Sequence, residues 1–142
     1  MWVISVPGRP VTENAFRRMH FHARSDYSLQ WKHAAEVLAR EAKIPSLESM
    51  HIIVRPFVTR RPFPDVAACA STVKACIDRL VHAKVVPDDD PSHHLSTLFL
   101  AAAIGKSNCL RIEVHEGPAG EPQNGKSGPP LQETRSFSSQ PS

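Results

Sequence analysis

The sequence predicts a small, single α+β domain in which two helices pack on a mixed β-sheet. Segments 2–6, 50–59, 95–103 and 110–115 are rich in the β-branched and aromatic residues typical of strands. Segments 28–43 and 66–84 place apolar residues at near-helical spacing. The expected order of elements is therefore β-α-β-α-β-β, followed by a C-terminal segment of different composition.

The first half of the chain alternates strand, loop, helix and strand. The strand 2–6 ends at the turn-forming pair Pro7-Gly8, and a polar, basic loop is expected over 9–27. Pro45 ends the following helix. Pro56 lies inside the strand 50–59 and predicts an edge position or a bulge, because proline cannot donate to a ladder. The apolar residues of the helix 28–43 are Leu29, Trp31, Ala34, Ala35, Leu38 and Ala42.

The second half contains a helix with one apolar face and two further strands. The helix 66–84 precedes the strands 95–103 and 110–115, which are joined by a short Gly-Lys-Ser-Asn segment at 105–108. The sequence contains no internal repeat. The apolar face of the helix is formed by Val66, Cys69, Val73, Ile77 and Leu80.

Composition divides the chain near Glu116. Proline, glycine and serine account for 14 of the 26 residues in 117–142, a composition that buries too little apolar surface to offset the entropy of ordering. We therefore expect a domain over 1–116 and a disordered tail over 117–142. The three cysteines form no CxxC pair, and the chain has neither a signal-like start nor a long apolar stretch. These features predict a cytoplasmic protein of a reducing compartment that does not enter a membrane.

Charge is unevenly distributed along the domain. The chain carries a net charge of +3 and has a pI of about 9.0, which is compatible with a polyanionic partner. Residues 1–64 carry ten Lys/Arg and five Asp/Glu, whereas residues 65–116 carry five and seven. Two interpretations stay open at this point: a chance asymmetry of the solvated surface, or a basic binding surface beside an acidic metal pocket.

Two acidic segments carry the candidate chemistry. Asp65 directly precedes the second expected helix, where it could cap the free N–H groups of the first turn. The run Asp88-Asp89-Asp90 places three carboxylates side by side, which indicates either a solvated turn or a site for a hard cation. Mg²⁺ prefers such oxygen ligands, usually one or two carboxylates completed by waters and phosphates.

The ordered set of motifs resembles the RusA family of Holliday-junction resolvases. The chain has a first strand ending in Pro7-Gly8, then Asn14 in a basic segment, and then Asp65 ahead of a helix. That helix carries a Lys-x-x-x-Asp-x-Leu pattern at 74–80, and the pair Asp88-Asp89 precedes a strand. The match spans nearly all of 1–116 in the same order. The resemblance implies a RusA-like fold and Mg²⁺-dependent, structure-selective cleavage of branched DNA by a homodimer, bacterial or phage-encoded, in recombination and repair.

The resemblance also implies a set of site residues. Asp65 and Asp89 match metal-binding aspartates of the family, and Lys74 matches its helix lysine, which would stabilise charge on the phosphate. Mg²⁺ is the expected cofactor, with Mn²⁺ as an alternative. An intrahelical ion pair between Lys74 and Asp78 is a competing explanation for that lysine. The implied catalytic residues are Asp65, Asp89 and Lys74, and the implied metal ligands are Asp65, Asp88, Asp89 and Asp78.

The chain departs from the family at one motif. Ala67 and Ala68 stand where the second Asp and the Asn of the family's Asp-x-Asp-Asn motif would fall. Asp88, Asp78 or Asp90 would then compensate, or metal binding would be weakened. The alternative to a nuclease is therefore a catalytically weak or inactive junction-binding protein on the same fold.

The basic residues of the first half are the expected contacts to DNA phosphates, which give affinity without sequence information. Phe16 and Phe21 lie in the same segment and either anchor it to the core or stack on bases at a branch. The histidines at 20, 22, 93 and 94 are too close in sequence for an unaided tetrahedral zinc site. The expected DNA-binding residues are Arg9, Asn14, Arg17, Arg18, Arg24, Arg60 and Arg61.

Overall fold

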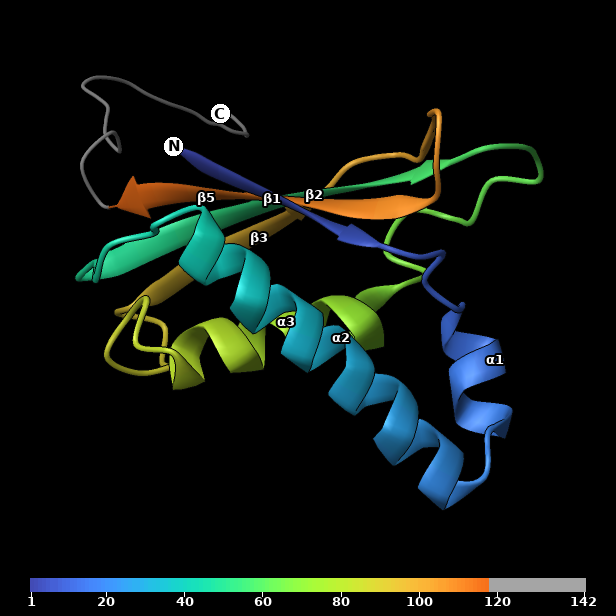
Figure 1. Cartoon of the computed structure of the whole chain (residues 1–142), viewed down its shortest axis with the longest axis horizontal. Coiled ribbons are helices and arrows are strands. Elements are labelled where there is room, and N and C mark those ends of the chain that lie inside the picture. Colours follow the sequence, from blue (N-terminus) through green and yellow to red (C-terminus); the bar gives the residue numbers. More distant parts are fainter. Residues whose placement is uncertain (118–142) are drawn as a thin grey trace, which may run out of the picture.

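The computed structural model describes residues 1–117, which form a two-layer α+β domain with the helices on one face of a mixed sheet (Figure 1). The strand order is β1-β5-β2-β3, and β4 pairs with β2 beyond the end of β3. The predicted fold class is thus confirmed. The expected disordered tail lies outside the described residues, apart from Gly117, which is the last residue of β5.

The antiparallel half of the sheet joins the two ends of the domain. β1 (Trp2–Pro7) pairs with β5 (Cys109–Gly117), with Ile4 opposite Ile112, and β5 pairs on its other side with β2 (Ser49–Val58). In β2, alternate residues are fully buried while their neighbours are half-buried, which is the pattern of a sheet covered on one face.

The expected loop over 9–27 was wrong, because this basic segment is largely helical. α1 (Glu13–Arg18) begins at Thr12, whose hydroxyl accepts a hydrogen bond from the N–H of Ala15 at 3.2 Å. α2 (Phe21–Glu41) then starts two turns earlier than predicted. Its first turns lie beyond the sheet, beside α1 (Figure 1), so they bury no apolar stripe and their periodicity gives little helical signal.

Pro56 does not mark an edge strand, because β2 lies inside the sheet with partners on both sides. The carbonyls of Val54 and Val58 accept hydrogen bonds from Leu100 and Gly105, on the side of β2 where β3 and β4 lie. Backbone polar groups point to the same side at every second residue of a strand, so the Pro56 nitrogen also points to that side. There the partner of β2 changes from β3, which pairs as far as Val54, to β4. The missing N–H therefore falls in a gap of the ladder.

The third helix and the strand expected directly after it are shorter than predicted. α3 (Ala70–His82) begins after a turn over 66–69, and Val66 is exposed rather than part of the apolar face. The expected strand 95–103 is divided into β3 (His94–Phe99) and β4 (Ala103–Ile104). β3 runs parallel to β2, and the register between them shifts between Met50 and His51.

One apolar core lies between the sheet and the helices. α2 contributes Trp31, Ala35 and Ala39, which are its buried residues. The rest of the predicted α3 face is buried, and the side chains of β2 and β5 that point to the helices complete the core. The fully buried strand residues include Val6, Met50, Ile52, Val54, Leu110, Ile112 and Val114.

Candidate active site

A cavity of about 220 Å³ opens between α3 and the edge strand β3. Its walls combine an apolar floor with the charged and polar groups of two distant segments. Lys74 and Asp78 come from consecutive turns of α3, and Asp89 comes from the loop that follows the helix. The lining residues are Ala70, Val73, Lys74, Ile77, Asp78, Asp89, His94, Thr97 and Phe99.

A bulge in β3 directs two polar side chains into this cavity. Met50 pairs with His94 and Ile52 pairs with Thr97, so β3 contains one residue more than β2 over this stretch. Met50 and Ile52 are both buried against the helices. The extra residue therefore turns both His94 and Thr97 to the helix-covered face. In a regular strand, residues three positions apart would lie on opposite faces.

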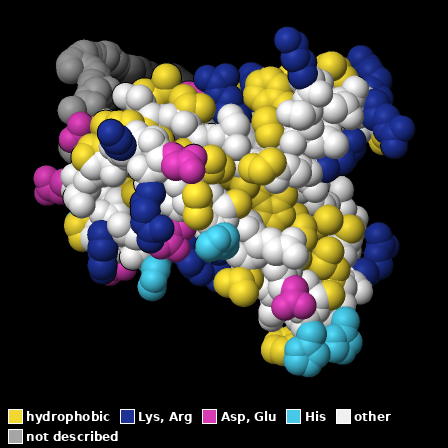
Figure 2. Space-filling view, in the orientation of Figure 1, with side chains coloured by type: hydrophobic (Ala, Val, Ile, Leu, Met, Phe, Trp, Pro, Cys, Tyr) yellow, Lys and Arg dark blue, Asp and Glu magenta, His cyan; other side chains and the backbone are white. Residues whose placement is uncertain are grey.

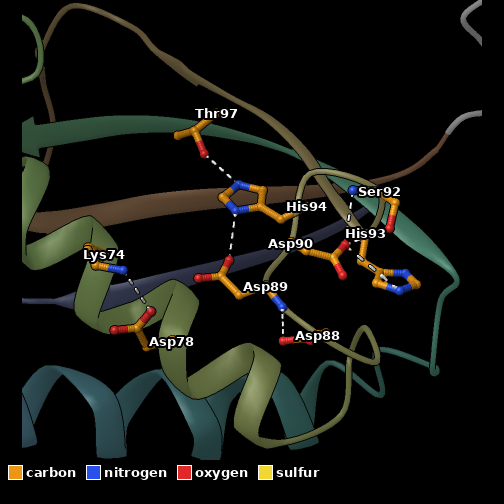
Figure 3. Close-up of polar contacts among 9 residues, drawn as sticks. All are labelled: Lys74, Asp78, Asp88, Asp89, Asp90, Ser92, His93, His94 and Thr97. Carbon is orange, nitrogen blue, oxygen red and sulfur yellow. Dashed lines mark hydrogen bonds and ion pairs between the residues drawn. The ribbon is translucent and has the colours of Figure 1, made fainter.

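His94 connects Asp89 to Thr97 through its two ring nitrogens. Its Nδ1 lies 3.2 Å from Oδ1 of Asp89, and its Nε2 lies 2.7 Å from the Thr97 hydroxyl. Figure 3 shows the Asp89 carboxylate between this imidazole and the side of α3 that carries Lys74 and Asp78. The His94 side chain is only 18 % exposed, so the loop aspartate is held against a largely buried partner.

Lys74 and Asp78 form the i,i+4 ion pair that the sequence offered as a competing explanation, with 3.3 Å between Nζ and Oδ1. The lysine side chain is 71 % exposed, so water screens the pair and it adds little to stability. Both side chains nevertheless line the cavity with Asp89. The ion pair therefore does not prevent either group from contacting a ligand there.

The other two aspartates of the run have local partners. Asp88 accepts a hydrogen bond from the N–H of Asp89 at 2.7 Å, and Asp90 accepts from both the N–H and the hydroxyl of Ser92. The Ser92 hydroxyl lowers the pKa of the Asp90 carboxyl. Asp90 lies toward Ser92 and His93 (Figure 3). Asp88 and Asp90 therefore stabilise the turn, and Asp89 is the residue of the run that lines the cavity.

Asp65 lines a different cavity, of about 440 Å³, together with Asn14 and Ala67. The interpretation of Asp65 as a helix cap is not supported, because Glu13 has that role. The carboxylate of Glu13 accepts hydrogen bonds from the N–H and the hydroxyl of Ser71 in the first turn of α3, at 2.7 and 2.8 Å. Among residues 1–117, no hydrogen bond or ion pair involves the Asp65 side chain.

The arrangement fits a cation held by few protein ligands. Among residues 1–117 no three His, Cys, Asp or Glu side chains form a metal-binding cluster. The carboxylates of Asp78 and Asp89 nevertheless share the α3–β3 cavity, which matches the one or two carboxylates that Mg²⁺ commonly takes from a protein. The structure thus brings together Asp78, Asp89 and Lys74 of the predicted site, and places Asp65 elsewhere.

Arginines gather where β2 ends. Arg9 crosses from the end of β1 and donates to the carbonyls of Arg60 and Pro62, at 3.4 and 2.6 Å. The Arg61 guanidinium lies over the Phe63 ring, 5.0 Å from its centroid. Figure 2 shows Lys and Arg side chains concentrated at this end of the molecule, over the β2–α3 and β4–β5 loops. Three of the predicted DNA-binding residues therefore share one surface.

A second basic surface lies on the helices. A cavity of about 560 Å³ is bordered by Phe16, Phe21, Arg24 and Lys32 among others. The Phe21 ring is 63 % exposed, and Phe16 lies against Tyr27, with 6.0 Å between the ring centroids. Phe16 therefore anchors α1, while Phe21 is accessible to a ligand. Of the other predicted contacts, Asn14 accepts a hydrogen bond from Arg17, and Arg17 and Arg18 are exposed on α1.

Comparison with models of known protein families gives no match, and no curated protein is significantly similar to the chain. The fold and the site are therefore interpreted from their geometry. Within residues 1–117, no helix has both the length and the apolar composition needed to cross a bilayer.

Sequence reasoning missed three residues. His94 was considered only as a zinc ligand and Thr97 gave no signal, because their shared face depends on a bulge that only the strand register reveals. Glu13 was placed in a loop, although Thr12, a residue type common at N-caps, followed by the acidic Glu13 is typical of a helix start. Glu13 bonds a residue that is distant in sequence, Ser71, and His94 and Thr97 share a face only because the register of β3 shifts by one residue.

Proposed function

We propose that the protein is a Mg²⁺-dependent endonuclease that cleaves branched DNA, as the resemblance to the RusA family implies. The observation that carries the proposal is the α3–β3 cavity, where Asp78, Asp89 and Lys74 line one polar site. Two carboxylates and one ammonium group match the needs of phosphodiester hydrolysis, in which a cation and a positive charge stabilise the phosphate.

The proposed roles follow from the position of each group. Asp89 and Asp78 hold the cation, and His94 holds Asp89. Lys74, which is largely exposed beside Asp78, contacts the phosphate once that carboxylate has another partner. The chemistry that a bound Mg²⁺ supplies is Lewis-acid polarisation of the phosphate and a lower pKa for the attacking water. Asp65, in the neighbouring cavity with Asn14, would hold a second cation beside the DNA strand.

The arginines supply the affinity for DNA. Arg9, Arg60 and Arg61 occupy one end of the molecule, and Arg24 and Lys32 border the helical cavity. Phosphate contacts of this kind are independent of base sequence, which suits a protein that recognises branch shape. A four-way junction has approximate two-fold symmetry, so we propose that the active form is an isologous homodimer that makes two matched cuts.

One observation favours a second candidate, a junction-binding protein without nuclease activity. Ala67 stands at the position of an expected ligand, and Asp65 and Asp89 line separate cavities. Both candidates share the DNA-binding surface and differ in whether the cavity binds a functional cation. A cleavage assay therefore separates them, whereas a binding assay alone does not.

The test compares Asp89→Asn and Asp78→Asn with the wild-type protein on a labelled four-way junction. We expect Asp89→Asn to lose Mg²⁺-dependent cleavage by at least about 100-fold while junction binding is kept or strengthened, because a negative charge near the phosphates is removed. Asp88→Asn is the matched control, since Asp88 bonds within its own turn. Equal cleavage by the wild type and Asp89→Asn would refute the proposed site.

A further inference from the structure

We propose that His94 is a positioning residue, which orients the Asp89 carboxylate for cation binding through a hydrogen-bond chain that starts at Thr97. This inference rests on the proposed function, because it concerns the same carboxylate. It adds two residues, His94 and Thr97, to a site otherwise built from aspartates and lysine.

The first argument is the bulge in β3, which sets the direction of the His94 side chain. A strand at the edge of a sheet needs no bulge to pair, yet β3 inserts one residue between the partners of Met50 and His51. Bulges of this kind change the direction of a side chain and are common next to functional sites. Here the bulge turns His94 from the outer face of the sheet to the face shared with Asp89.

The second argument is the direction of the hydrogen bonds. Nε2 of His94 lies 2.7 Å from the Thr97 hydroxyl, and Nδ1 lies 3.2 Å from Oδ1 of Asp89. A neutral imidazole has one N–H, and a carboxylate can only accept. Nδ1–H therefore donates to Asp89, and in the neutral ring Nε2 accepts from the hydroxyl of Thr97. The carboxylate of Asp89 in this way selects the Nδ1–H tautomer, and the Thr97 hydroxyl bonds Nε2 and so holds the ring in place.

The third argument concerns the oxygen that remains. Within residues 1–117, Oδ1 of Asp89 has His94 as its partner, while Oδ2 makes no hydrogen bond or ion pair. One oxygen is thus fixed by the protein and the other is directed to the cavity that also contains Asp78 (Figure 3). Partners that orient a ligating carboxylate typically change metal affinity about 10–100-fold when removed.

Two substitutions separate this role from simple packing. The amide nitrogen of Asn is attached at the same carbon as His Nδ1, and that of Gln corresponds to Nε2. His94→Asn therefore keeps a donor for Asp89, whereas His94→Gln keeps only a group near Thr97. The control is His51→Gln, because His51 bonds Ser96 in the neighbouring pair on the opposite face.

The experiment measures Mn²⁺ binding to each full-length variant by calorimetry without DNA, with thermal unfolding as a check on folding. We expect His94→Gln to weaken Mn²⁺ binding about 10–100-fold, and His94→Asn to weaken it much less. Thr97→Val should lower the affinity by a smaller factor, because the His94 ring then loses its hydrogen bond at Nε2 and is held less firmly. His51→Gln should bind as the wild type does.

Three results overturn the inference in distinguishable ways. If the wild type binds Mn²⁺ and both His94 variants bind it equally well, the positioning role is wrong and the proposed function stands. If the wild type binds no Mn²⁺, the proposed function and this inference fail together. If Thr97→Val abolishes cleavage with full Mn²⁺ affinity, the hydroxyl acts directly and the positioning chain is refuted.

Discussion

Replacing Glu13 by alanine should destabilise the domain, because this one carboxylate joins α1 to the start of α3. It accepts two hydrogen bonds from Ser71 at 2.7 and 2.8 Å, and the N–H of Glu13 itself donates to the Ala68 carbonyl at 2.8 Å. The N-cap residue of α3, Cys69, makes no capping hydrogen bond with its side chain. Glu13 therefore satisfies one of the free N–H groups of this helix start, that of Ser71.

The magnitude follows from the loss of a helix cap. Removing a capping side chain costs about 0.5–2 kcal/mol, and hydrogen bonds to a charged group are at the upper end of the usual range. We therefore expect a loss of about 1–2 kcal/mol in the free energy of unfolding. An unfolding entropy of about 2.1 cal/mol/K per residue over the 117 described residues converts this into a Tm lower by about 4–8 °C.

Thermal unfolding followed by circular dichroism measures this change. Glu13→Gln should lose about half as much, because it keeps an acceptor but not the negative charge at the positive end of the helix. Asp65→Ala is the matched control and should shift Tm by less than about 1 °C, since the Asp65 side chain has no hydrogen-bond partner among residues 1–117. An equal loss in Asp65→Ala, or no loss in Glu13→Ala, would refute the assignment of the cap.

Three further predictions concern the surface and the thiols. Arg60→Ala with Arg61→Ala should reduce the slope of log K against log salt for junction binding by about two, at 0.9 per phosphate contact; an unchanged slope would exclude them as phosphate contacts. Phe21→Ala should leave Tm unchanged and weaken junction binding by about 5–150-fold, the equivalent of about 1–3 kcal/mol per stacked base. Leu98→Ala, at another exposed apolar residue, should not weaken junction binding. Burial raises the pKa of the Cys76 thiol to about 12 and raises that of Cys69, so Ellman's reagent at pH 8 should label the half-buried Cys109 first and all three thiols only after denaturation; fast labelling of Cys76 would contradict the packing of α3.

The fold class was predictable because the core segments carry their own periodicity. The buried side of α3 follows the spacing of Cys69, Val73, Ile77 and Leu80, which a sequence pattern detects without tertiary information. The helical segment at 13–27 was not predictable in this way, because α1 buries none of its residues and the buried residues of α2 begin at Trp31. Caps hold these turns, and the apolar periodicity is too weak to reveal them.

The site was predictable only in part. Lys74 and Asp78 are neighbours by helix geometry, so their pairing follows from sequence spacing. The approach of Asp89 to the same cavity depends on the chain returning along α3, and the contribution of His94 depends on a shift of one residue in strand register. Register is set by the packing of a whole strand against its neighbours, so local sequence could not reveal either feature.

The most direct test of the central claim is to incubate the pure, full-length protein with a synthetic four-way junction, with and without Mg²⁺. The account predicts paired incisions near the branch that require Mg²⁺ or Mn²⁺, while a linear duplex of the same sequence stays intact. A junction that is bound but never cut in either metal ion would contradict the nuclease and leave the junction-binding protein. A junction that is neither bound nor cut would contradict both.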